Sequence, residues 1–505
     1  MELLSFQTAA LLLIAVLAVK LFPKRAADFV LAAETLYVLY ENNTTFYFIV
    51  TLLILAAVYL GGRLLEALGE KKARVLTYLM VAALALGLCI WKYRNFFIGN
   101  INFVARHLTG REPLALAEVS APFGISYLFL ILISYILGIY WRVMKARSNP
   151  MEYLHLIAFF PICFMGPILG MEDMKESERL EVSYHSLTFG LQRICWGVFQ
   201  KLVISERCAV VVNTIYAQPE VYGGFYVVLA ALLFVLQLYT EFAGAMDIVC
   251  GAAEMIGKKL PENFDRPFAA VTIAEFWRRW HITLGAWLRN FVLYPLLRTR
   301  LFLWMGEKLK KKFGKKRGRN LVTYMGLLVS WFLIGLWHGG GWNYIFGSGI
   351  FMWFLIVGSE VLQPVFQKIT GALRINKDCW SYQSFAKIRT MLLFAFGNIF
   401  FRAGTFSAAI TLLKAMVRNF NPWIFADGSL LALGLDAKDW NVCVAAVLLL
   451  FLVSQIKKRC DVRDWLASQN LVFRWGVIYG LLAVILLFGC YGSGYDAASF
   501  IYQGF

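Results

Sequence analysis

One histidine stands in a strongly apolar stretch, LIGLWHGGGWNYIFG, and a run of three glycines follows it directly. This residue, His338, carries an imidazole that titrates near neutrality, and burial favours its neutral form, which can accept a proton. A neutral imidazole in a protected cavity can deprotonate a hydroxyl or thiol that attacks an acyl ester. Trp337, Asn343 and Tyr344 are near in sequence and could orient the ring or donate hydrogen bonds to an oxyanion. The same pattern also fits a buried histidine with satisfied hydrogen bonds and no catalytic role.

A second histidine, His281, lies in the segment AEFWRRWHITLGAWLRNFVLYPL, which is rich in tryptophan and arginine. On a helix, Trp277, Trp280 and His281 would share one face, and Glu275 could pair with either arginine of the motif. Such a stretch more often lies along the membrane interface, or re-enters the bilayer, than spans it. The pattern therefore predicts either an interfacial anchor or one wall of a site.

Other membrane-embedded polar residues cluster in LQLYTEFAGAMDIVCGAAEMIG. Gln237 and Glu241 share a helical face there, and Asp247 lies further along. These groups could form an ion or proton pathway, or they could hydrogen-bond one helix to another. The chain has no GxSxG, phosphate-binding-loop, GxGxxG or HExxH motif, and its nine cysteines lack metal-ligand spacing, so we expect no metal site.

The elements that must position these residues are membrane helices. The chain has 505 residues, of which 60% are hydrophobic and only 16% charged. Apolar windows long enough to cross a hydrocarbon core recur along its whole length, and we expect roughly 11 to 13 transmembrane and re-entrant elements. The first apolar stretch lacks a basic n-region and a small-residue cleavage site, which favours a retained span over a signal peptide. The sequence thus predicts an all-α polytopic membrane protein.

The formal charge of +18 is distributed over short loops between the predicted spans, which argues against nucleic-acid binding. The segment 298–319 holds ten Lys or Arg residues and a single acid. Basic loops face the cytoplasm, so residues 321–337 should run outward and the loop 419–440 should lie outside. The basic loops could also attract anionic lipid or an acidic carrier protein.

The three glycines after His338 should break a helix, because glycine costs about 1 kcal/mol per residue in a helix interior relative to alanine. Such a break at membrane depth is tolerated only where the freed backbone is buried in protein or lines a wet cavity. We therefore expect His338 at a helix end, beside a cavity open to the outer side. No repeat or long linker interrupts the chain, and we predict one integral domain over residues 1–505: N-terminal spans 1–90, a core 91–420 and C-terminal spans 421–505.

Several of these motifs resemble signatures of the membrane-bound O-acyltransferase (MBOAT) family, most closely its bacterial alginate O-acetylase branch. The two main ones run from FAGAMDIVCGAAEM through WRRWH to YPL, and over GLWHGGGWNYIFG. Further similar motifs follow in family order: WKYRNFF, APFGISY, MGPILG, FQKLVI, FFRAGTF and the tail GYDAASFIYQGF. The branch differs in three places: a GG pair usually follows its YxPL element, an aspartate commonly stands at Asn290, and a basic residue often replaces the acid-rich MEDMKESERLE.

The resemblance implies a ring of helices around a thinned centre, with cytosolic and outer openings that meet near the catalytic histidine. It implies that His338 is that catalytic histidine and that His281 is the second histidine needed for activity. We place four further residues in the wall of the substrate site: Trp277, Arg279, Trp337 and Asn343.

The expected function is transfer of an acyl group, with acetyl as the leading choice, from a cytosolic thioester to an extracellular or cell-wall polysaccharide. Acetyl-CoA or a phosphopantetheinyl carrier protein would be the donor, and no cofactor is bound permanently. The expected partners are a membrane-anchored acyl-transfer protein outside the cell, a cytosolic acyl carrier, the polysaccharide acceptor and the lipid bilayer. The protein should be multi-pass in the cell (cytoplasmic) membrane.

Three alternatives remain. The first is D-alanyl transfer to teichoic acids from a carrier protein. The second is a transporter or flippase that couples protons through Glu241 and Asp247, and the third is a scaffold without acyl chemistry.

Overall fold

The computed structural model describes residues 1–116, 121–175, 180–491 and 500. Over these residues the regular secondary structure is helical, apart from one isolated β-bridge between Phe264 and Trp280. The chain divides into two compact units, each built from separate stretches of sequence. Unit 1 comprises Met1–Arg207, Leu238–Glu262 and Asn441–Phe505, and unit 2 comprises Cys208–Gln237 and Asn263–Trp440.

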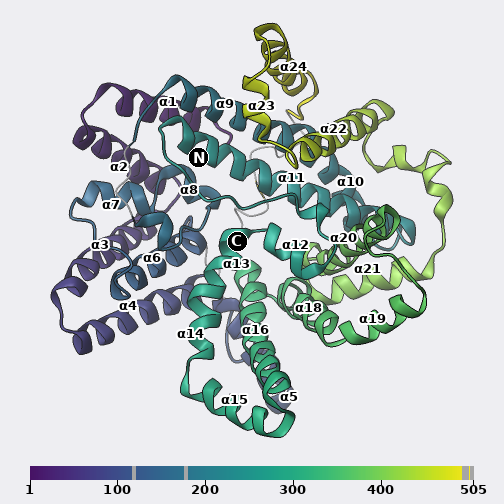
Figure 1. The fold of residues 1–505 in the computed structure, drawn as a ribbon, viewed down its shortest axis with the longest axis horizontal. Coiled ribbons are helices and arrows are strands. Elements are labelled where there is room, and N and C mark those ends of the chain that lie inside the picture. Colours follow the sequence, from purple (N-terminus) through teal and green to yellow (C-terminus); the bar gives the residue numbers. More distant parts are fainter. Residues whose placement is uncertain (117–120, 176–179, 492–499, 501–505) are drawn as a thin grey trace. The chain divides into compact units, whose positions relative to one another are not determined.

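Unit 1 contains the N-terminal and C-terminal helices (Figure 1). In the described part of the chain, the helices that cross a unit boundary are α10 (Glu206–Ala217), α11 (Phe225–Met255) and α22 (Ala437–Ile456). The helices that lie wholly in unit 1 are α1 (Phe6–Leu21), α2 (Lys24–Glu41), α3 (Thr45–Ala67), α4 (Glu70–Trp91), α5 (Arg94–Thr109), α6 (Ile125–Tyr140), α7 (Pro150–Ile157), α8 (Phe160–Met165), η1 (Glu172–Met174), α9 (Tyr184–Phe199), η2 (Gln200–Ser205), α23 (Val462–Ala467) and α24 (Leu471–Phe488).

Unit 2 contains the segments with the two candidate histidines. Its helices are η3 (Pro267–Ala269), α12 (Ile273–Arg279), α13 (Ile282–Leu288), η4 (Arg289–Leu293), α14 (Tyr294–Leu297), α15 (Arg300–Phe313), α16 (Lys315–Gly339), α17 (Trp342–Tyr344), η5 (Ile345–Ile350), α18 (Phe351–Val361), α19 (Gln363–Ala372), α20 (Trp380–Arg402), α21 (Phe406–Arg418), η6 (Pro422–Phe425) and η7 (Ser429–Leu433). The segments η2, η4 and η5 are π-helices, a form that is often found at functional sites.

Among the residues that the structure describes, eight helical stretches are long and apolar enough to cross a membrane: α3, α4, α11, α16, Trp342–Val361, α20, α22 and α24. Four shorter apolar stretches accompany them, at Phe6–Leu21, Ile125–Tyr140, Pro150–Met165 and Ile282–Leu297. Together they fall within the predicted range of membrane elements. The prediction of an all-α polytopic membrane protein is therefore confirmed.

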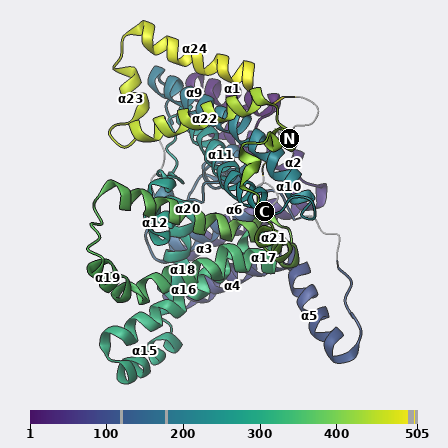
Figure 2. The ribbon, with the colours of Figure 1, turned by 90° about the vertical axis from the view of Figure 1, so that its right-hand side faces the viewer.

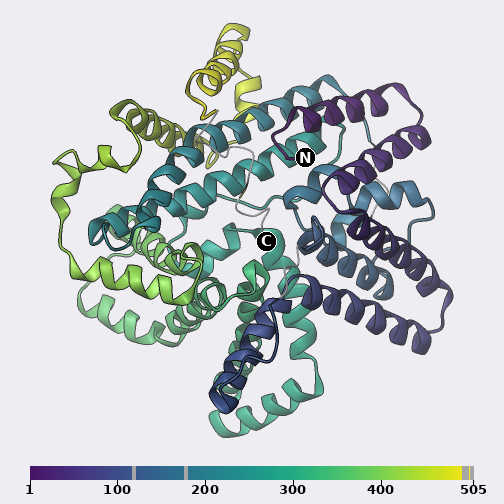
Figure 3. The same cartoon turned by 180° about the vertical axis from the view of Figure 1, so that it is seen from behind.

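Apolar helices in unit 1 are of two kinds, those buried inside the protein and those with an exposed apolar surface. The helix α6, ISYLFLILISYILGIY, is apolar on every side, and nearly all of its residues are buried between α3, α4 and α7. By contrast, α3 and α4 form an antiparallel pair with a two-residue connection (Figure 3). They leave many large apolar side chains exposed, as lipid-facing helices do. Near the end of the chain, α24 packs along α9 (Figure 2).

In unit 2, the basic segment forms a helical hairpin in which α15 packs against α16 (Figure 1). The helix α15 is amphipathic, with exposed Leu301, Leu303 and Trp304 and with lysines in its last turn. This combination is typical of a helix at a membrane surface. The loop 419–440, predicted to lie outside, folds back so that Leu433 and Leu435 pack against Val211 and Ile215 of α10.

The predicted single domain with sections 1–90, 91–420 and 421–505 stays a prediction, and the two compact units cut across those sections. The ring of helices around a central passage and the sidedness of the loops also stay predictions. The motif tail at 494–505 lies outside the described residues except for Phe500, and so do residues 176–179 of the acid-rich loop.

Candidate active site

His338 lies in the last turn of α16, where the glycines end the helix as the sequence predicts. Gly340 caps the helix in the left-handed conformation, with φ of 62°, and its N–H donates to the Leu336 carbonyl at 3.0 Å. Glycine adopts this conformation without steric cost, which explains its use at helix C-termini. The His338 side chain is 3% exposed, so protein and not lipid surrounds it.

His281 does not lie on a helix. The helix α12 ends at Arg279, Trp280 is extended, and His281 adopts the left-handed conformation with φ of 46°. The predicted helical face shared by Trp277, Trp280 and His281 is therefore wrong.

A pairing between distant segments explains this difference. The Asp265 N–H donates to the Arg279 carbonyl at 3.0 Å, and the Ile282 N–H donates to the Asn263 carbonyl at 3.1 Å. Because of these bonds, the chain leaves the helix after residue 279, and residues 279–282 lie beside residues 263–265. The local periodicity of the sequence does not reveal this pairing.

Asn263 fixes the tautomer of His281. Its side-chain oxygen accepts from the Thr283 N–H at 3.1 Å and from the Thr283 hydroxyl at 2.7 Å, which identifies that atom as the acceptor. The Nδ1 atom of His281 lies 3.3 Å from the same oxygen. A neutral imidazole must then carry its proton on Nδ1, and Nε2 is left as the basic nitrogen. His281 is also 3% exposed.

Trp337 connects the two histidines. Its ring centroid lies 5.6 Å from that of His281 and 5.2 Å from that of His338, in edge-on geometry in both cases. Phe401 of α20 contacts the other side of the cluster, with its ring 5.3 Å from His338. The structure thus brings together three of the six residues predicted for the site, His281, Trp337 and His338, although 57 positions separate the histidines in sequence.

Asn343 lies next to the cluster and donates a hydrogen bond to the backbone of α20. It is 3% exposed, and its Nδ2 atom donates to the Phe400 carbonyl at 3.3 Å. Tyr344 packs its ring 5.1 Å from Phe401. The short helix α17 is therefore fastened to the same end of α20 that contacts His338.

The two remaining predicted residues have other surroundings. Trp277 packs 5.0 Å from Trp331, two turns before His338 on α16, and 5.8 Å from Phe394 of α20. Arg279 forms an ion pair with Glu275 at 2.8 Å, as the spacing predicts, and a longer one with Asp265 at 3.6 Å. The Arg279 guanidinium is therefore committed to two carboxylates, and its predicted role in substrate binding stays a prediction.

Glycines allow the helices of the site to approach closely. A Cβ atom on Gly335 would meet the Ile345 backbone, and one on Gly349 would lie 2.7 Å from the Trp331 carbonyl oxygen. Between α20 and η5, a Cβ on Gly397 of α20 would lie 2.9 Å from the carbonyl oxygen of Gly347 in η5. Small residues of this kind set the distance between membrane helices. They hold α16, η5 and α20 at the separation that puts Phe401 against His338.

Sequence reasoning missed Asn263 and Phe401. Asn263 lies in the matched segment KKLPENFDRPF, but no spacing rule links it to a histidine 18 positions away. Phe401 belongs to the motif FFRAGTF, whose position at a helix end could have pointed to the site.

The carboxylates of α11 form ion pairs and hydrogen bonds with α9 and η2 in unit 1. Asp247 accepts from Arg193 at 3.0 Å and from Gln200 at 2.9 Å. Glu241 lies 3.6 Å from Lys201. These contacts match the helix-to-helix alternative for the cluster.

The comparison with known families covers both histidines. Residues 142–403 match the family described as "MBOAT, membrane-bound O-acyltransferase family", and the chain belongs to that family.

Among similar proteins is the "Probable alginate O-acetylase AlgI" of Pseudomonas syringae pv. tomato, 31% identical over 72% of this chain and 65% of that protein. The "Peptidoglycan O-acetyltransferase" of Helicobacter pylori is 26% identical over 65% of this chain and 62% of its own length. The "Teichoic acid D-alanyltransferase" of Bacillus subtilis is 30% identical over 44% of this chain and 55% of its own length. The aligned part of the chain spans less than two thirds of each of these relatives.

Proposed function

We propose that this protein is an O-acyltransferase that moves an acyl group, acetyl in the leading version, from a cytosolic thioester to an extracytoplasmic polysaccharide. The observation that carries the proposal is that two buried imidazoles, those of His281 and His338, both contact one indole, that of Trp337. Two of the relatives named above are an alginate and a peptidoglycan acetylase, which supports acetyl as the group and a glycan as the acceptor.

In the proposed reaction, the neutral imidazole of His338 takes the proton of an attacking hydroxyl. The hydroxyl oxygen bonds to the thioester carbonyl carbon, the carbon–sulfur bond breaks, and the imidazolium returns the proton to the leaving thiolate. His281 presents Nε2 as the basic atom because Nδ1–H is held by Asn263. We assign to His281 the positioning of the donor or of the intermediate near the thioester.

The proposal includes the expected donors, acetyl-CoA or a phosphopantetheinyl carrier protein. It also includes a membrane-anchored partner outside the cell that completes delivery, and a location in the cytoplasmic membrane. A cytosolic donor requires access from the inner side, which is consistent with the dense positive charge of the hairpin between α15 and α16.

D-alanyl transfer is the second candidate. It is favoured by one observation, the 30% identity to a teichoic acid D-alanyltransferase, which extends over 44% of this chain. The first candidate is preferred because the similarity to the alginate acetylase extends over 72% of the chain.

The test measures acyl transfer with the full-length protein in its native membrane, with radiolabelled acetyl and D-alanyl thioesters supplied in parallel. The variant His338→Ala should lose label transfer by at least about a hundredfold, as expected for a general base. The matched control is His185→Ala, which removes an exposed imidazole that stacks on Phe189 in unit 1 and should leave transfer unchanged. Transfer at the wild-type rate by His338→Ala would refute the assignment of His338 as the general base, and absence of label transfer by the wild type from either thioester would overturn the proposed activity.

A further inference from the structure

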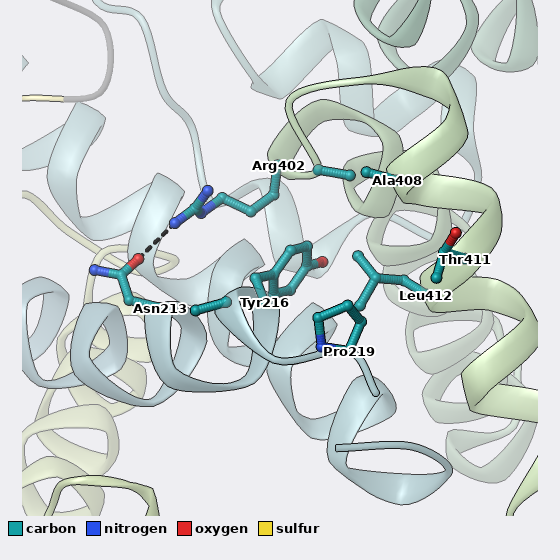
Figure 4. A pocket seen from close by; sticks show the side chains of 9 residues that line it. Asn213, Tyr216, Pro219, Arg402, Ala408, Thr411 and Leu412 are labelled. Carbon is teal, nitrogen blue, oxygen red and sulfur yellow. Dashed lines mark hydrogen bonds between the residues drawn. The ribbon is translucent and has the colours of Figure 1, made fainter. Parts of the chain in front are cut away.

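A pocket of about 470 Å³ lies in unit 2 between the end of α10, the end of α20 and the start of α21 (Figure 4). Its volume falls in the range of small-molecule sites. Three polar side chains line it, those of Asn213, Arg402 and Thr411, together with the ring of Tyr216 and the apolar Pro219 and Leu412. Of these residues only Arg402 lies in a motif quoted from the sequence, FFRAGTF, and none was assigned to a site there.

Arg402 supplies the charge of this pocket. One guanidinium nitrogen, Nη2, donates to the Asn213 side-chain oxygen at 2.6 Å, and the guanidinium lies 5.5 Å from the centroid of the Tyr216 ring. These two contacts fix the side chain across the pocket (Figure 4). Within the described part of the chain, no carboxylate forms an ion pair with Arg402. Its other N–H groups form a fork suited to a carboxylate or phosphate.

Tyr216 adds a second binding group. Its hydroxyl oxygen is buried and has no hydrogen-bond partner among the residues that the structure describes. A buried hydroxyl that makes no hydrogen bond is unfavourable, which is why such groups are usually paired in a functional state. In Figure 4 the phenol ring extends between Arg402 and Leu412, so its hydroxyl lies among the residues that line the pocket.

The remaining lining suits a hydroxyl-rich molecule. The exposed Asn213 has a side-chain NH₂ group as donor, while its oxygen is held by Arg402. The Thr411 hydroxyl donates to the Ser407 carbonyl at 3.2 Å, and its oxygen can still accept. Pro219 and Leu412 offer apolar surface beside these groups. A mixture of amide, hydroxyl and apolar walls around one cation fits a sugar that carries an anionic group.

The pocket is joined to the histidine cluster by the end of α20. Phe401, whose ring contacts His338 at 5.3 Å, directly precedes Arg402. The charge rule predicts that α20 starts at the cytoplasmic basic loop 368–389 and runs outward, so Arg402 should lie at its outer end. By this rule the pocket lies on the acceptor side of the membrane, one residue along α20 from the ring that contacts His338.

We propose that the pocket formed by Asn213, Tyr216, Arg402 and Thr411 binds an acceptor sugar unit that carries a carboxylate or a phosphate. Arg402 holds the anionic group, and the amide and hydroxyl groups hold the sugar hydroxyls. The role as acceptor site rests on the proposed function, but binding itself is measured without catalysis.

The experiment measures binding to the full-length protein in nanodiscs of uncharged lipid. Three probes of equal length are used: a hexamer of a uronic acid, a phosphorylated hexaglucan and an unmodified hexaglucan. The first two distinguish carboxylate from phosphate as the anionic group. The wild type should bind one of these two at least about tenfold more tightly than the neutral probe, because charge-assisted hydrogen bonds are the stronger ones. Equal affinity for all three probes would overturn the proposal.

Variants separate a specific site from general charge. Arg402→Gln should weaken binding of the anionic probe by about tenfold or more, and Arg402→Lys by less, because the charge remains and the fork is lost. Tyr216→Phe, which keeps the ring, should weaken binding by about threefold to tenfold. Arg418→Gln removes an exposed arginine at the end of the same α21 and should bind as the wild type does. An equal loss in Arg418→Gln, or none in Arg402→Gln, would refute the site.

The same binding measurement on His338→Ala separates this inference from the proposed function. If His338→Ala binds the anionic probe and loses this binding when Arg402→Gln is added, the site is supported whatever the outcome of the acyl-transfer assay. If His338→Ala still transfers acyl groups while Arg402→Gln loses anion binding, the catalytic role proposed for His338 falls and the binding site stands.

Discussion

The indole ring of Trp337 lies 5.6 Å from the imidazole of His281, a residue on a different segment of unit 2, while His338 follows Trp337 in the chain. One aromatic side chain thus contacts both imidazoles. The site therefore includes more than His338. Trp337, the residue before it on α16, also contacts His281 in the turn between α12 and α13.

Replacement of Trp337 should damage both stability and activity. Trp337→Ala leaves a cavity between two buried rings, and we expect a loss of about 3–5 kcal/mol in the free energy of unfolding. Trp337→Phe keeps a ring and should lose less stability, but acyl transfer should still fall because the imidazoles can shift. Thermal unfolding and transfer rates check this in the same preparation. Trp342→Ala is the control, since that indole is 51% exposed just beyond the glycine break. A comparable loss in both variants would contradict the specific role of Trp337.

Asn263 should control the tautomer of His281. In Asn263→Ala, the Thr283 N–H and hydroxyl lose their buried acceptor together with His281 Nδ1, at a cost of about 1–3 kcal/mol for each unsatisfied group. The ¹⁵N chemical shifts of the labelled imidazole report which nitrogen carries the proton. We expect the Nδ1–H form in the wild type and a mixture in the variant. Thr283→Val removes the hydroxyl but leaves Asn263 for His281, so the Nδ1–H signal should persist. An Nε2–H form in the wild type would disprove the assignment.

The close approach of α16 and η5 should tolerate no side chain at Gly335. A Cβ there would lie 2.8 Å from the Tyr344 carbonyl oxygen and closer still to Ile345. We expect Gly335→Ala to lower the free energy of unfolding by about 1–3 kcal/mol and to displace α17. Gly358→Ala is the matched control, because nothing lies within 4 Å of its Cβ position in α18 and alanine favours helix there. Equal thermal stability of the two variants would show that the helices can separate without penalty.

The charge rule places the basic hairpin inside and the loop 419–440 outside. Gly314 and Gly428 are suitable insertion points for a short epitope, since both have positive φ and nothing within 4 Å of their Cβ positions. We expect an antibody to reach the Gly314 epitope only in inside-out vesicles and the Gly428 epitope only in right-side-out vesicles. Retained acyl transfer confirms that each insertion leaves the fold intact. Both epitopes on one side, or the reverse order, would refute the predicted topology.

The features that follow from local composition were predictable. Apolar runs identify the spans because lipid requires them, and three consecutive glycines identify the end of α16 because glycine is a poor helix former. The Glu275–Arg279 ion pair follows from helical spacing.

Contacts between distant segments were not predictable in this way. The pairing of residues 263–265 with residues 279–282 decides the conformation of His281, and backbone hydrogen bonds of this kind leave no periodic signal. For the same reason the pocket at Arg402 was missed, since Asn213 and Arg402 are 189 positions apart. Motif similarity located the two histidines, but only the fold shows which side chains hold them.

The left-handed backbone at His281 has a practical consequence. Only glycine adopts φ of 46° without strain, and a side chain there costs roughly 1–2 kcal/mol. His281→Gly should therefore relieve the main chain while it opens a void the size of the missing ring. Imidazole dissolved in the medium could diffuse into that void and replace the absent group. If the rate of acyl transfer recovers and saturates with imidazole concentration, the imidazole ring acts at this position without a covalent bond to the chain. The shape of the void alone then holds the ring in place.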